Sequence, residues 1–357
     1  LPSFSMQVIG NIEVLPNEVL LECFKYLNGV DFLYSFNQLN FRFNQLIESI
    51  PLHLDFQNIE KSVFHMFCHK VLSNEKIGRQ IYSLNLSNKF TCNQILLFLG
   101  FFSFNEFPQL QSLSLIEVKS YDVLPLKLRL PVIGQLRRFR LDDTSNEGEK
   151  LLSILPSSQL RHLELSTLPS DLRLIKQFSS LINIRISGCS PPSLCNLLST
   201  ITHVKYLKVD DVHVHVDSTF DRHMIREWGK SAYENVSTNP SMNLQHLIIK
   251  FTDHYDKLKM ILERTPNLIN LTLSMNASYI NKTNINQLEQ WITSLLPYLK
   301  IFKFTIQGSS RSVDDAIQET IKEFQCDFWS QEHNCYTRCS VFGHDASIYI
   351  IPFICDS

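Results

Sequence analysis

The sequence is poor in glycine, which leaves little material for the phosphate-binding loops of nucleotide enzymes. Only 10 of its 357 residues are glycine, and neither G-x-x-x-x-G-K-[ST] nor G-x-G-x-x-G occurs. The G-x-S-x-G elbow, the H-E-x-x-H zinc motif and the kinase signatures are also missing. We therefore expect a protein that is not an enzyme and that has no cofactor.

The sequence also lacks an excess of positive or negative charge. The chain carries 33 Lys and Arg against 35 Asp and Glu, which gives a net charge of -2 and a pI near 6.7. This balance disfavours a diffuse nucleic-acid binder. Hydrophobic residues make up 44% of the chain, which is enough for a substantial folded core.

Long apolar runs and a paired set of cysteines are absent as well. The longest apolar candidate, Ile95 to Phe104, is too short to span a membrane and contains Gly100 and Ser103. Leu1 to Gly10 lack the charged start and apolar middle of a signal peptide. Nine scattered cysteines, an odd number, indicate reduced thiols. We expect a cytoplasmic or nuclear protein that binds neither membrane nor nucleic acid.

What the sequence does contain is an internal repeat: apolar, two variable, apolar, one variable, apolar. The nine occurrences begin at Ile81, Leu110, Leu136, Leu160, Leu181, Val204, Leu244, Leu268 and Leu299. The end of each unit alternates with period two, as a strand with one buried face does. Helix-like stretches with apolar spacings of three and four lie between units, at 93–102, 147–155, 255–264 and 286–295.

A single strand–helix unit cannot bury its own apolar face, so such units stack and share a core. The repeats resemble leucine-rich repeats of irregular length. The predicted fold is α/β, a solenoid (horseshoe) of about nine irregular repeats over residues 58–357, with an insertion at 210–243 and a C-terminal cap at 325–357. An ordinary α/β domain in which the pattern recurs by chance is the alternative.

Residues 11–57 do not contain the repeat, and we expect them to form a compact helical segment. A first helix begins at Leu15-Pro16-Asn17-Glu18, with proline where a missing N–H costs nothing, and Asn28-Gly29 stops it. We expect a second helix at 31–37 and a third at 41–50, ending before Pro51. These helices carry more apolar side chains than they can bury among themselves, which is typical of a docking surface.

Leu15 to Leu27, LPNEVLLECFKYL, resembles the opening of an F-box, whose motif reads roughly L-P-x-E-[LIV] and then an apolar helix face. Asn40 to Leu46, NFRFNQL, resembles the third F-box helix. The chain departs from the pattern at Cys23, where Ile or Val is usual, and it lacks the common tryptophan. F-boxes are known to be paired with leucine-rich repeats.

The resemblance implies a substrate adaptor of an SCF-type ubiquitin ligase. In that family the F-box binds the Skp adaptor, which links it to a cullin-based ligase, and the repeats hold a protein substrate. The implied Skp contacts are Leu15, Pro16, Glu18, Leu20, Leu21, Phe24 and Leu27. The alternative is a leucine-rich-repeat binding scaffold without a ligase role, in which the first helices cap the solenoid and bury Leu20, Phe24 and Leu27 against the first repeat.

Residues between the apolar strand positions would line the open face of the sheet, where a substrate would bind. The candidates are Arg138, Arg140, His162, Arg185, Tyr206 and Lys208. Their arginines and lysine suggest a locally positive track for an acidic or phosphorylated partner. A solvated strand face without a ligand is the alternative.

Two groups of metal-type side chains lie outside the repeats, and we predict no metal site at either. The insertion carries His213, His215, Asp217, Asp221 and His223. His213 and His215 would lie on one face of a strand, but no third ligand follows them at a recognisable distance. The C-terminal piece carries Cys326, His333, Cys335, Cys339, His344 and Cys355 in a spacing that matches no zinc ribbon. We expect a capping strand or hairpin there.

Overall fold

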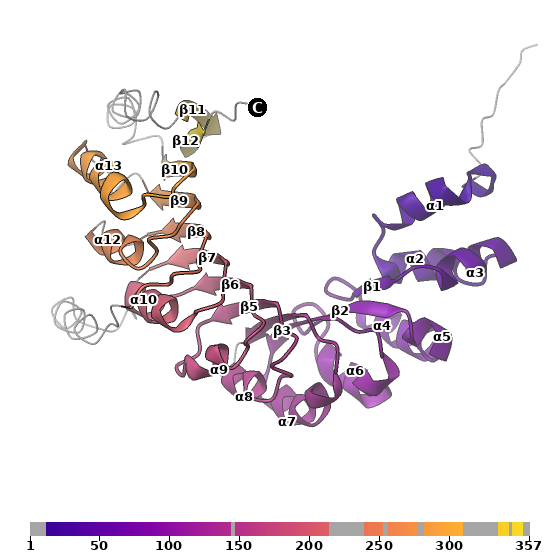
Figure 1. Cartoon of the computed structure of the whole chain (residues 1–357). Helices are drawn as coiled ribbons and strands as arrows, with labels where there is room; N and C mark the ends of the chain where they lie inside the picture. The colour runs from indigo at the N-terminus through magenta and orange to yellow at the C-terminus, as the bar shows by residue number, and fades with distance from the viewer. Residues whose placement is uncertain are drawn as a thin grey trace, which may run out of the picture. The chain divides into compact units, whose positions relative to one another are not determined.

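The structure is a computed structural model that describes residues 12–143, 147–213, 239–252, 256–276, 282–309, 335–342 and 345–352. The chain divides into two compact units, Leu1–Leu136 (unit 1) and Arg137–Ser357 (unit 2), which are described separately (Figure 1). Both units are α/β, with parallel strands and helices that alternate along the chain, as the sequence predicts.

Unit 1 opens with a short 3-10 turn and three short helices: η1 (Ile12–Val14), α1 (Asn17–Phe24), α2 (Gly29–Phe36) and α3 (Phe41–Glu48). The Asn40 side chain caps α3 by accepting from the Phe43 N–H at 2.9 Å. Asn28, expected only to end the first helix, caps α2 by accepting from the Val30 N–H, so α2 begins two residues earlier than expected.

These three helices share an aromatic core. The Phe24 ring lies 4.5 Å from Phe32, 5.2 Å from Phe36 and 6.2 Å from Phe43, measured between ring centres. Phe36 also stacks on Phe43 at 5.2 Å. Tilted and offset ring pairs at these separations add stability beyond the buried area. The core joins one aromatic residue of α1 to α2 and α3.

The rest of unit 1 is a three-stranded parallel sheet with helices. Its elements are β1 (Leu52–Asp55), α4 (Lys61–Phe67), η2 (Cys68–Leu72), α5 (Glu75–Gly78), β2 (Ile81–Ser87), α6 (Gln94–Phe101), η3 (Phe104–Glu106), β3 (Ser112–Val118), α7 (Ser120–Arg129) and η4 (Leu130–Val132). β1 pairs with β2, and β2 with β3, all parallel. The buried Gln94 side chain ties two strands together, donating to the Phe56 carbonyl and accepting from the Ser87 N–H.

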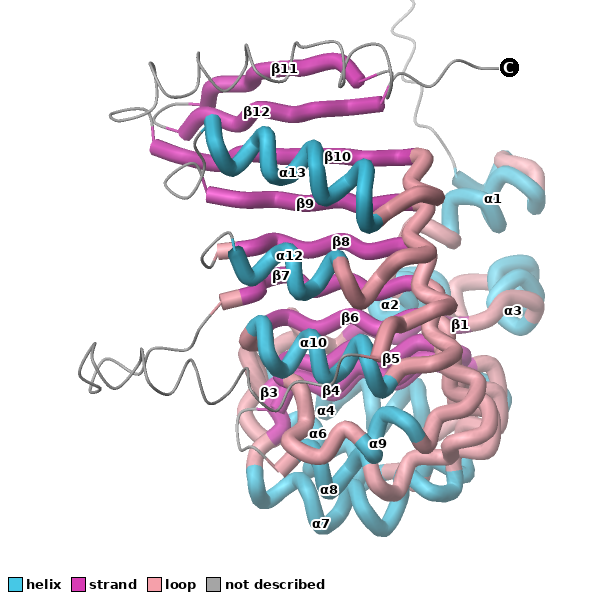
Figure 2. The backbone as a smooth tube through the Cα atoms, turned by 60° about the vertical axis from the view of Figure 1, so that its left-hand side comes forward, coloured by secondary structure: helices cyan, strands magenta, loops and turns pink. Residues whose placement is uncertain are grey.

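Unit 2 repeats a strand and a short helix along its length. Its elements are β4 (Arg138–Asp143), α8 (Gly148–Leu152), β5 (His162–Thr167), α9 (Arg173–Lys176), β6 (Asn183–Gly188), α10 (Pro191–Thr200), β7 (Tyr206–Val212), β8 (His246–Phe251), α12 (Asp256–Leu262), β9 (Asn270–Asn276), α13 (Lys282–Leu295) and β10 (Ile301–Ser309). Consecutive strands from β4 to β10 pair in parallel. Helices α10, α12 and α13 cover the same face of this sheet (Figure 2).

Every one of the nine sequence repeats coincides with a parallel strand, β2 to β10, so the predicted strands are confirmed. The motif's apolar positions form the core: Leu163, Ile184 and Leu207 are adjacent in register and buried. Burial of one such side chain is worth about 1.5–3 kcal/mol. The alternate positions point away from the helices and form the open face of the sheet.

The sheet of unit 2 ends in an antiparallel hairpin rather than in another repeat. Strands β11 (Cys335–Phe342) and β12 (Asp345–Pro352) pair with each other, and β12 also pairs antiparallel with β10. This hairpin lies within the range where a capping strand or hairpin is expected from the sequence.

Candidate docking surfaces

The N-terminal helices and the turns that flank them leave many apolar side chains exposed, although the core of the helices is filled. We call these exposed residues the N-terminal apolar set: Val14, Leu15, Val19, Tyr26, Leu27, Tyr34, Leu39 and Phe41. The largest exposures are those of Tyr26 (83%), Val14 (79%) and Phe41 (76%). Exposed aromatic and aliphatic side chains at this density on so short a segment are typical of an interaction site.

The implied Skp contacts separate into two groups. Leu20 and Phe24 are buried, and Phe24 packs inside the aromatic core, so both hold the helices together and are not presented to a partner. Leu15, Pro16, Glu18 and Leu27 are exposed, and Leu21 is half-buried. Sequence reasoning missed Val14, Val19, Tyr26, Tyr34, Leu39 and Phe41 as exposed apolar residues. High hydrophobicity alone does not tell which helix face turns inward.

Arg42 fixes the turn that presents Leu15 and Pro16. From α3 its guanidinium donates to the carbonyl oxygens of Glu13 and Leu15, and its Nε donates to Asn17 Oδ1 at 2.8 Å. Asn40 adds a bond from its amide to Glu13 Oε1 at 2.8 Å. Charge-assisted bonds to two carbonyls on one short segment hold it in a single conformation against α3.

Helix α2, rather than α1, attaches the helices to the sheet of unit 1. The Asn28 amide donates to the Asp55 carbonyl at 2.8 Å, and its Oδ1 accepts from the Asp55 N–H at 3.0 Å. At Gly29 the backbone of α2 approaches β1 so closely that an added Cβ would lie 2.5 Å from the His53 carbonyl oxygen. The N-terminus of α2 therefore rests directly on the strand.

In unit 2 the strand register arranges the open face of the sheet as rows of polar side chains. The first polar row is Arg138, His162, Asn183, Tyr206, His246 and Asn270. The second polar row is Arg140, Glu164, Arg185 and Lys208, followed by Ile248 and Thr272. The register therefore brings all six predicted substrate residues onto one face.

The three cations of the second polar row are ion-paired within the chain. Glu164 lies between Arg140 at 3.5 Å and Arg185 at 3.3 Å. Asp210 in turn binds Arg185 at 2.9 Å and Lys208 at 3.1 Å. The hydrogen bond to Asp210 raises the pKa of Arg185. Partial burial by itself would raise the pKa of Asp210, but hydrogen bonds from Lys208 and Arg185 lower it overall.

The expected positive track across the strands is therefore interrupted. Cations and carboxylates alternate along Arg140, Glu164, Arg185 and Asp210, so three of the four predicted cations already have anionic partners. The acidic residue that follows Lys208 by two positions points to the same face because a strand repeats every second residue.

The first polar row contains two matched amide–imidazole pairs. The Asn183 amide lies 2.9 Å from His162 Nδ1, and the Asn270 amide lies 2.7 Å from His246 Nδ1. Each of these bonds joins side chains of two neighbouring strands. Partial burial, followed by the charges of Arg138 and Arg161, lowers the pKa of His162, which favours its neutral form.

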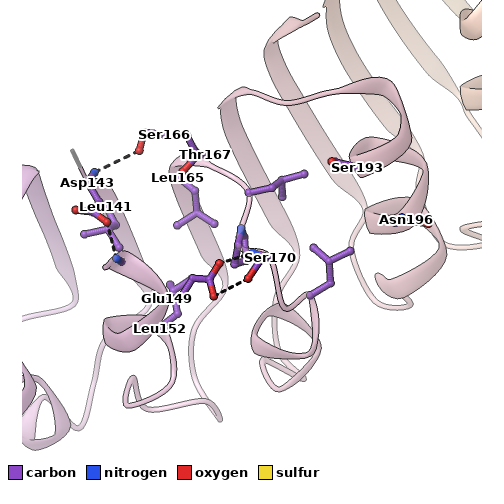
Figure 3. A pocket seen from close by; sticks show the side chains of 14 residues that line it. Leu141, Asp143, Glu149, Leu152, Leu165, Ser166, Thr167, Ser170, Ser193 and Asn196 are labelled. Atoms are coloured by element: carbon purple, nitrogen blue, oxygen red, sulfur yellow. Dashed lines mark hydrogen bonds between the residues drawn. The ribbon is translucent and has the colours of Figure 1, made fainter. Parts of the chain in front are cut away.

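A pocket of about 310 Å³ lies between α8, the segment after β5, and α10 (Figure 3). Its acidic groups are already bonded within the chain. Asp143 accepts from the Gly148 N–H at the start of α8, and Glu149 accepts from the Ser170 N–H and, at 3.0 Å, from the Ser170 hydroxyl. The acidic groups of the pocket therefore have a structural role, because they hold together the segments that line it.

The predicted metal-type groups lie largely outside the described residues. His215, Asp217, Asp221 and His223 fall in 214–238, and Cys326, His333, His344 and Cys355 also lie outside the described ranges. Within those ranges no cluster of three potential metal ligands occurs. Burial raises the pKa of Cys68 and Cys189 to about 12 and that of Cys195 to about 11, so these thiols stay protonated at neutral pH. None of the described helices has the length and apolar content that a membrane crossing requires.

Comparison with known proteins places the chain in no family. No family model matches it, and no curated protein matches it. One solved structure that does match is the crystal structure of the Rad7 and Elc1 complex in yeast, at 14% identity and a TM-score of 0.36, over 80% of this chain and 85% of that chain. A likeness this distant carries no argument, so the function is inferred from the residues described above.

Proposed function

We propose that this chain is a substrate-recognition adaptor of an SCF-type ubiquitin ligase. In this proposal an F-box in residues 11–57 binds the Skp adaptor, and leucine-rich repeats in the solenoid that follows bind a protein substrate. The observation that carries the proposal is the N-terminal apolar set, exposed on and beside helices whose own aromatic core is already filled.

The chemistry of this set suits a stable docking site. Tyr26, Tyr34 and Phe41 are aromatic and largely exposed, and aromatic residues supply much of the energy of protein interfaces. Each 100 Å² of apolar surface removed from water contributes roughly 2.5 kcal/mol before the cost of association is subtracted. The Leu15–Pro16 turn is held by Arg42 before any partner arrives, so little ordering entropy remains to be lost on binding.

A pull-down with a purified Skp adaptor tests this proposal. The full-length wild type should retain the adaptor, and Leu15→Ala/Pro16→Ala should retain much less. A matched control is Leu124→Ala/Leu128→Ala, which trims two leucines that are 68% and 72% exposed on α7 of the same unit. The control should bind as the wild type does. Failure of the wild type to retain the adaptor overturns the ligase role, whereas equal binding of all three proteins overturns the assignment of the contacts.

A second candidate is a repeat scaffold without a ligase role, in which the helices cap the sheet. The contact of Asn28 and Gly29 with β1 favours it, because a cap must rest on the first strand. However, Phe24 packs on α2 and α3, and Leu27 stays 44% exposed, which suits a cap less well. Under both candidates we propose that the chain acts by binding and not by catalysis, in the cytoplasm or the nucleus.

A further inference from the structure

Among the described cations of unit 2 without an ion pair, three arginines lie next to one another at the start of β4 and β5, whereas Lys250 and Lys303 lie on β8 and β10. Arg138 pairs in register with His162, and the Arg161 N–H donates to the Arg137 carbonyl at 2.9 Å. Arg138 is the first residue of β4, and Arg137 and Arg161 directly precede β4 and β5, so the backbone brings three exposed arginines to the start of these two strands. We call them the arginine cluster.

The arginine cluster differs from the second polar row in its electrostatic state. Arg140, Arg185 and Lys208 each bind a carboxylate, whereas no ion pair within the described residues involves a member of the cluster. The lowered pKa of His162, to which Arg138 and Arg161 contribute, is consistent with their proximity. Three like charges held together without a counter-charge repel one another, and an anionic ligand removes that repulsion.

We propose that Arg137, Arg138 and Arg161 bind an oxoanion group, a carboxylate or a phosphate, on a protein partner that lies across the open face of unit 2. The inference rests on the proposed function only in that a substrate occupies this face. Guanidinium groups present paired N–H donors that match the two oxygens of such a group. His162, which pairs in register with Arg138, adds a polar ring beside the cluster.

Aspartates lie toward the other end of these strands. Asp142 is near the end of β4, and Asp210, near the end of β7, binds Arg185 and Lys208. With a rise of about 3.3 Å per residue, a six-residue strand separates the two edges by roughly 16 Å. A polyanion such as RNA that crossed this face would meet those carboxylates, whereas a peptide with one local acidic group would not. We therefore favour a peptide.

Titration of three fluorescein-labelled peptides of equal length into the full-length protein, without any Skp adaptor, tests the proposal. One peptide carries glutamates at its centre, one phosphoserines and one serines. We expect saturable binding of the glutamate peptide, the phosphoserine peptide or both, and the stronger one identifies the oxoanion. Arg138→Gln/Arg161→Gln should weaken it about tenfold or more. Equal binding of the serine peptide, or no binding of any peptide, overturns the proposal.

Two further variants separate the arginine cluster from general charge effects. Arg173→Gln removes an exposed arginine of the same unit that binds Asp171 at 2.8 Å, and it should leave the affinity within about twofold. Glu164→Gln releases Arg140 from its carboxylate and should strengthen binding about two- to fivefold, a gain that misfolding would not produce. A loss with Arg173→Gln equal to that of the double variant contradicts the proposal, as does a single-stranded oligouridine that binds as tightly as the acidic peptides.

Failure of this inference and failure of the proposed function are distinguishable. The peptide titration involves only residues of unit 2, and the adaptor pull-down involves only the N-terminal helices of unit 1. Adaptor binding without peptide binding removes the arginine cluster alone. Peptide binding without adaptor binding removes the ligase role and leaves a repeat protein that recognises an oxoanion.

Discussion

Gly29 is the residue at which the fold leaves least room for a side chain. A Cβ there would lie 2.5 Å from the His53 carbonyl oxygen and 3.0 Å from Leu54 Cδ2. Backbone cannot yield as a flexible side chain does, so Gly29→Ala should displace α2 from β1. We expect the variant to lower the free energy of unfolding by about 1–3 kcal/mol in chemical denaturation.

Gly100 supplies the matched control for this substitution. It lies in α6, and nothing lies within 4 Å of a Cβ built on it. Since alanine favours a helix over glycine, Gly100→Ala should raise the free energy of unfolding by about 0.5–1 kcal/mol. If both substitutions shifted stability in the same direction, the close contact of α2 with β1 would be wrong.

Asp122 is a buried carboxylate whose ionisation opposes folding. Its Oδ2 accepts from the Lys119 N–H and the Asn88 amide, both at 2.8 Å, while Oδ1 has no hydrogen-bond partner within the described residues. Burial raises its pKa, and the two hydrogen bonds offset only part of this rise. The folded state thus holds this proton more tightly than the unfolded state.

The sign of the pH dependence follows from the raised pKa of Asp122. Stability from this group is fully present below the unfolded pKa and is lost as pH rises through the folded pKa, and a tenfold difference in proton affinity between the two states is worth roughly 1.4 kcal/mol. We expect Asp122→Asn, which keeps an oxygen acceptor, to remove this loss. Chemical denaturation at several pH values above 4 should show the free energy of unfolding of the variant rising relative to that of the wild type as pH increases. A constant difference would contradict the raised pKa.

At the scale of elements, Arg42 of α3 holds the segment that precedes α1. Removal of its bonds to Glu13, Leu15 and Asn17 should loosen residues 13–17 without opening the aromatic core. We expect Arg42→Ala to speed hydrogen exchange there and to weaken adaptor binding about three- to tenfold, because the segment must be ordered again on binding.

Arg79→Ala is the control, since Arg79 forms an exposed ion pair with Glu75 on α5 of the same unit. Such pairs contribute little, so exchange at residues 13–17 and adaptor affinity should remain as in the wild type. An Arg42→Ala protein that bound the adaptor with unchanged affinity would show that the ordered turn is not part of the interface.

The elements themselves were largely predictable from periodicity. All nine repeats are strands because each alternates apolar and polar positions in register with its neighbours. β1 was not predicted because Leu52 and Leu54, which pair with Ile81 and Leu84, are two residues apart instead of three, since the register shifts between Leu52 and His53. The start of α2 was misplaced because an Asn-Gly pair both ends helices and, as here, caps them.

The sites were harder to predict than the elements. Leu20 and Phe24 have the hydrophobicity of docking residues, and only the packing of three helices shows that they face inward. The charges of the sheet face depend on which residues are neighbours across strands. Glu164 forms ion pairs with both Arg140 and Arg185 because the register puts it between them, a relation that cannot be read from the separation of these residues in the sequence.

At the scale of the whole molecule, we assign a different task to each unit. Unit 1 exposes apolar groups around helices whose aromatic core is filled, and unit 2 exposes a polar sheet face with the arginine cluster at one edge. Apolar docking tolerates salt, whereas recognition of a charged group weakens with it. The two surfaces thus suit two different partners, and the adaptor role depends on the first of them.

Calorimetric titration of the full-length protein with a purified Skp adaptor tests this central claim most directly. Burial of the N-terminal apolar set predicts saturable one-to-one binding with a negative change in heat capacity. Tyr26→Ala/Phe41→Ala should weaken binding about tenfold or more, because both aromatic side chains are largely exposed in the free protein. A titration of the folded wild type that gives no saturable binding would contradict the adaptor role.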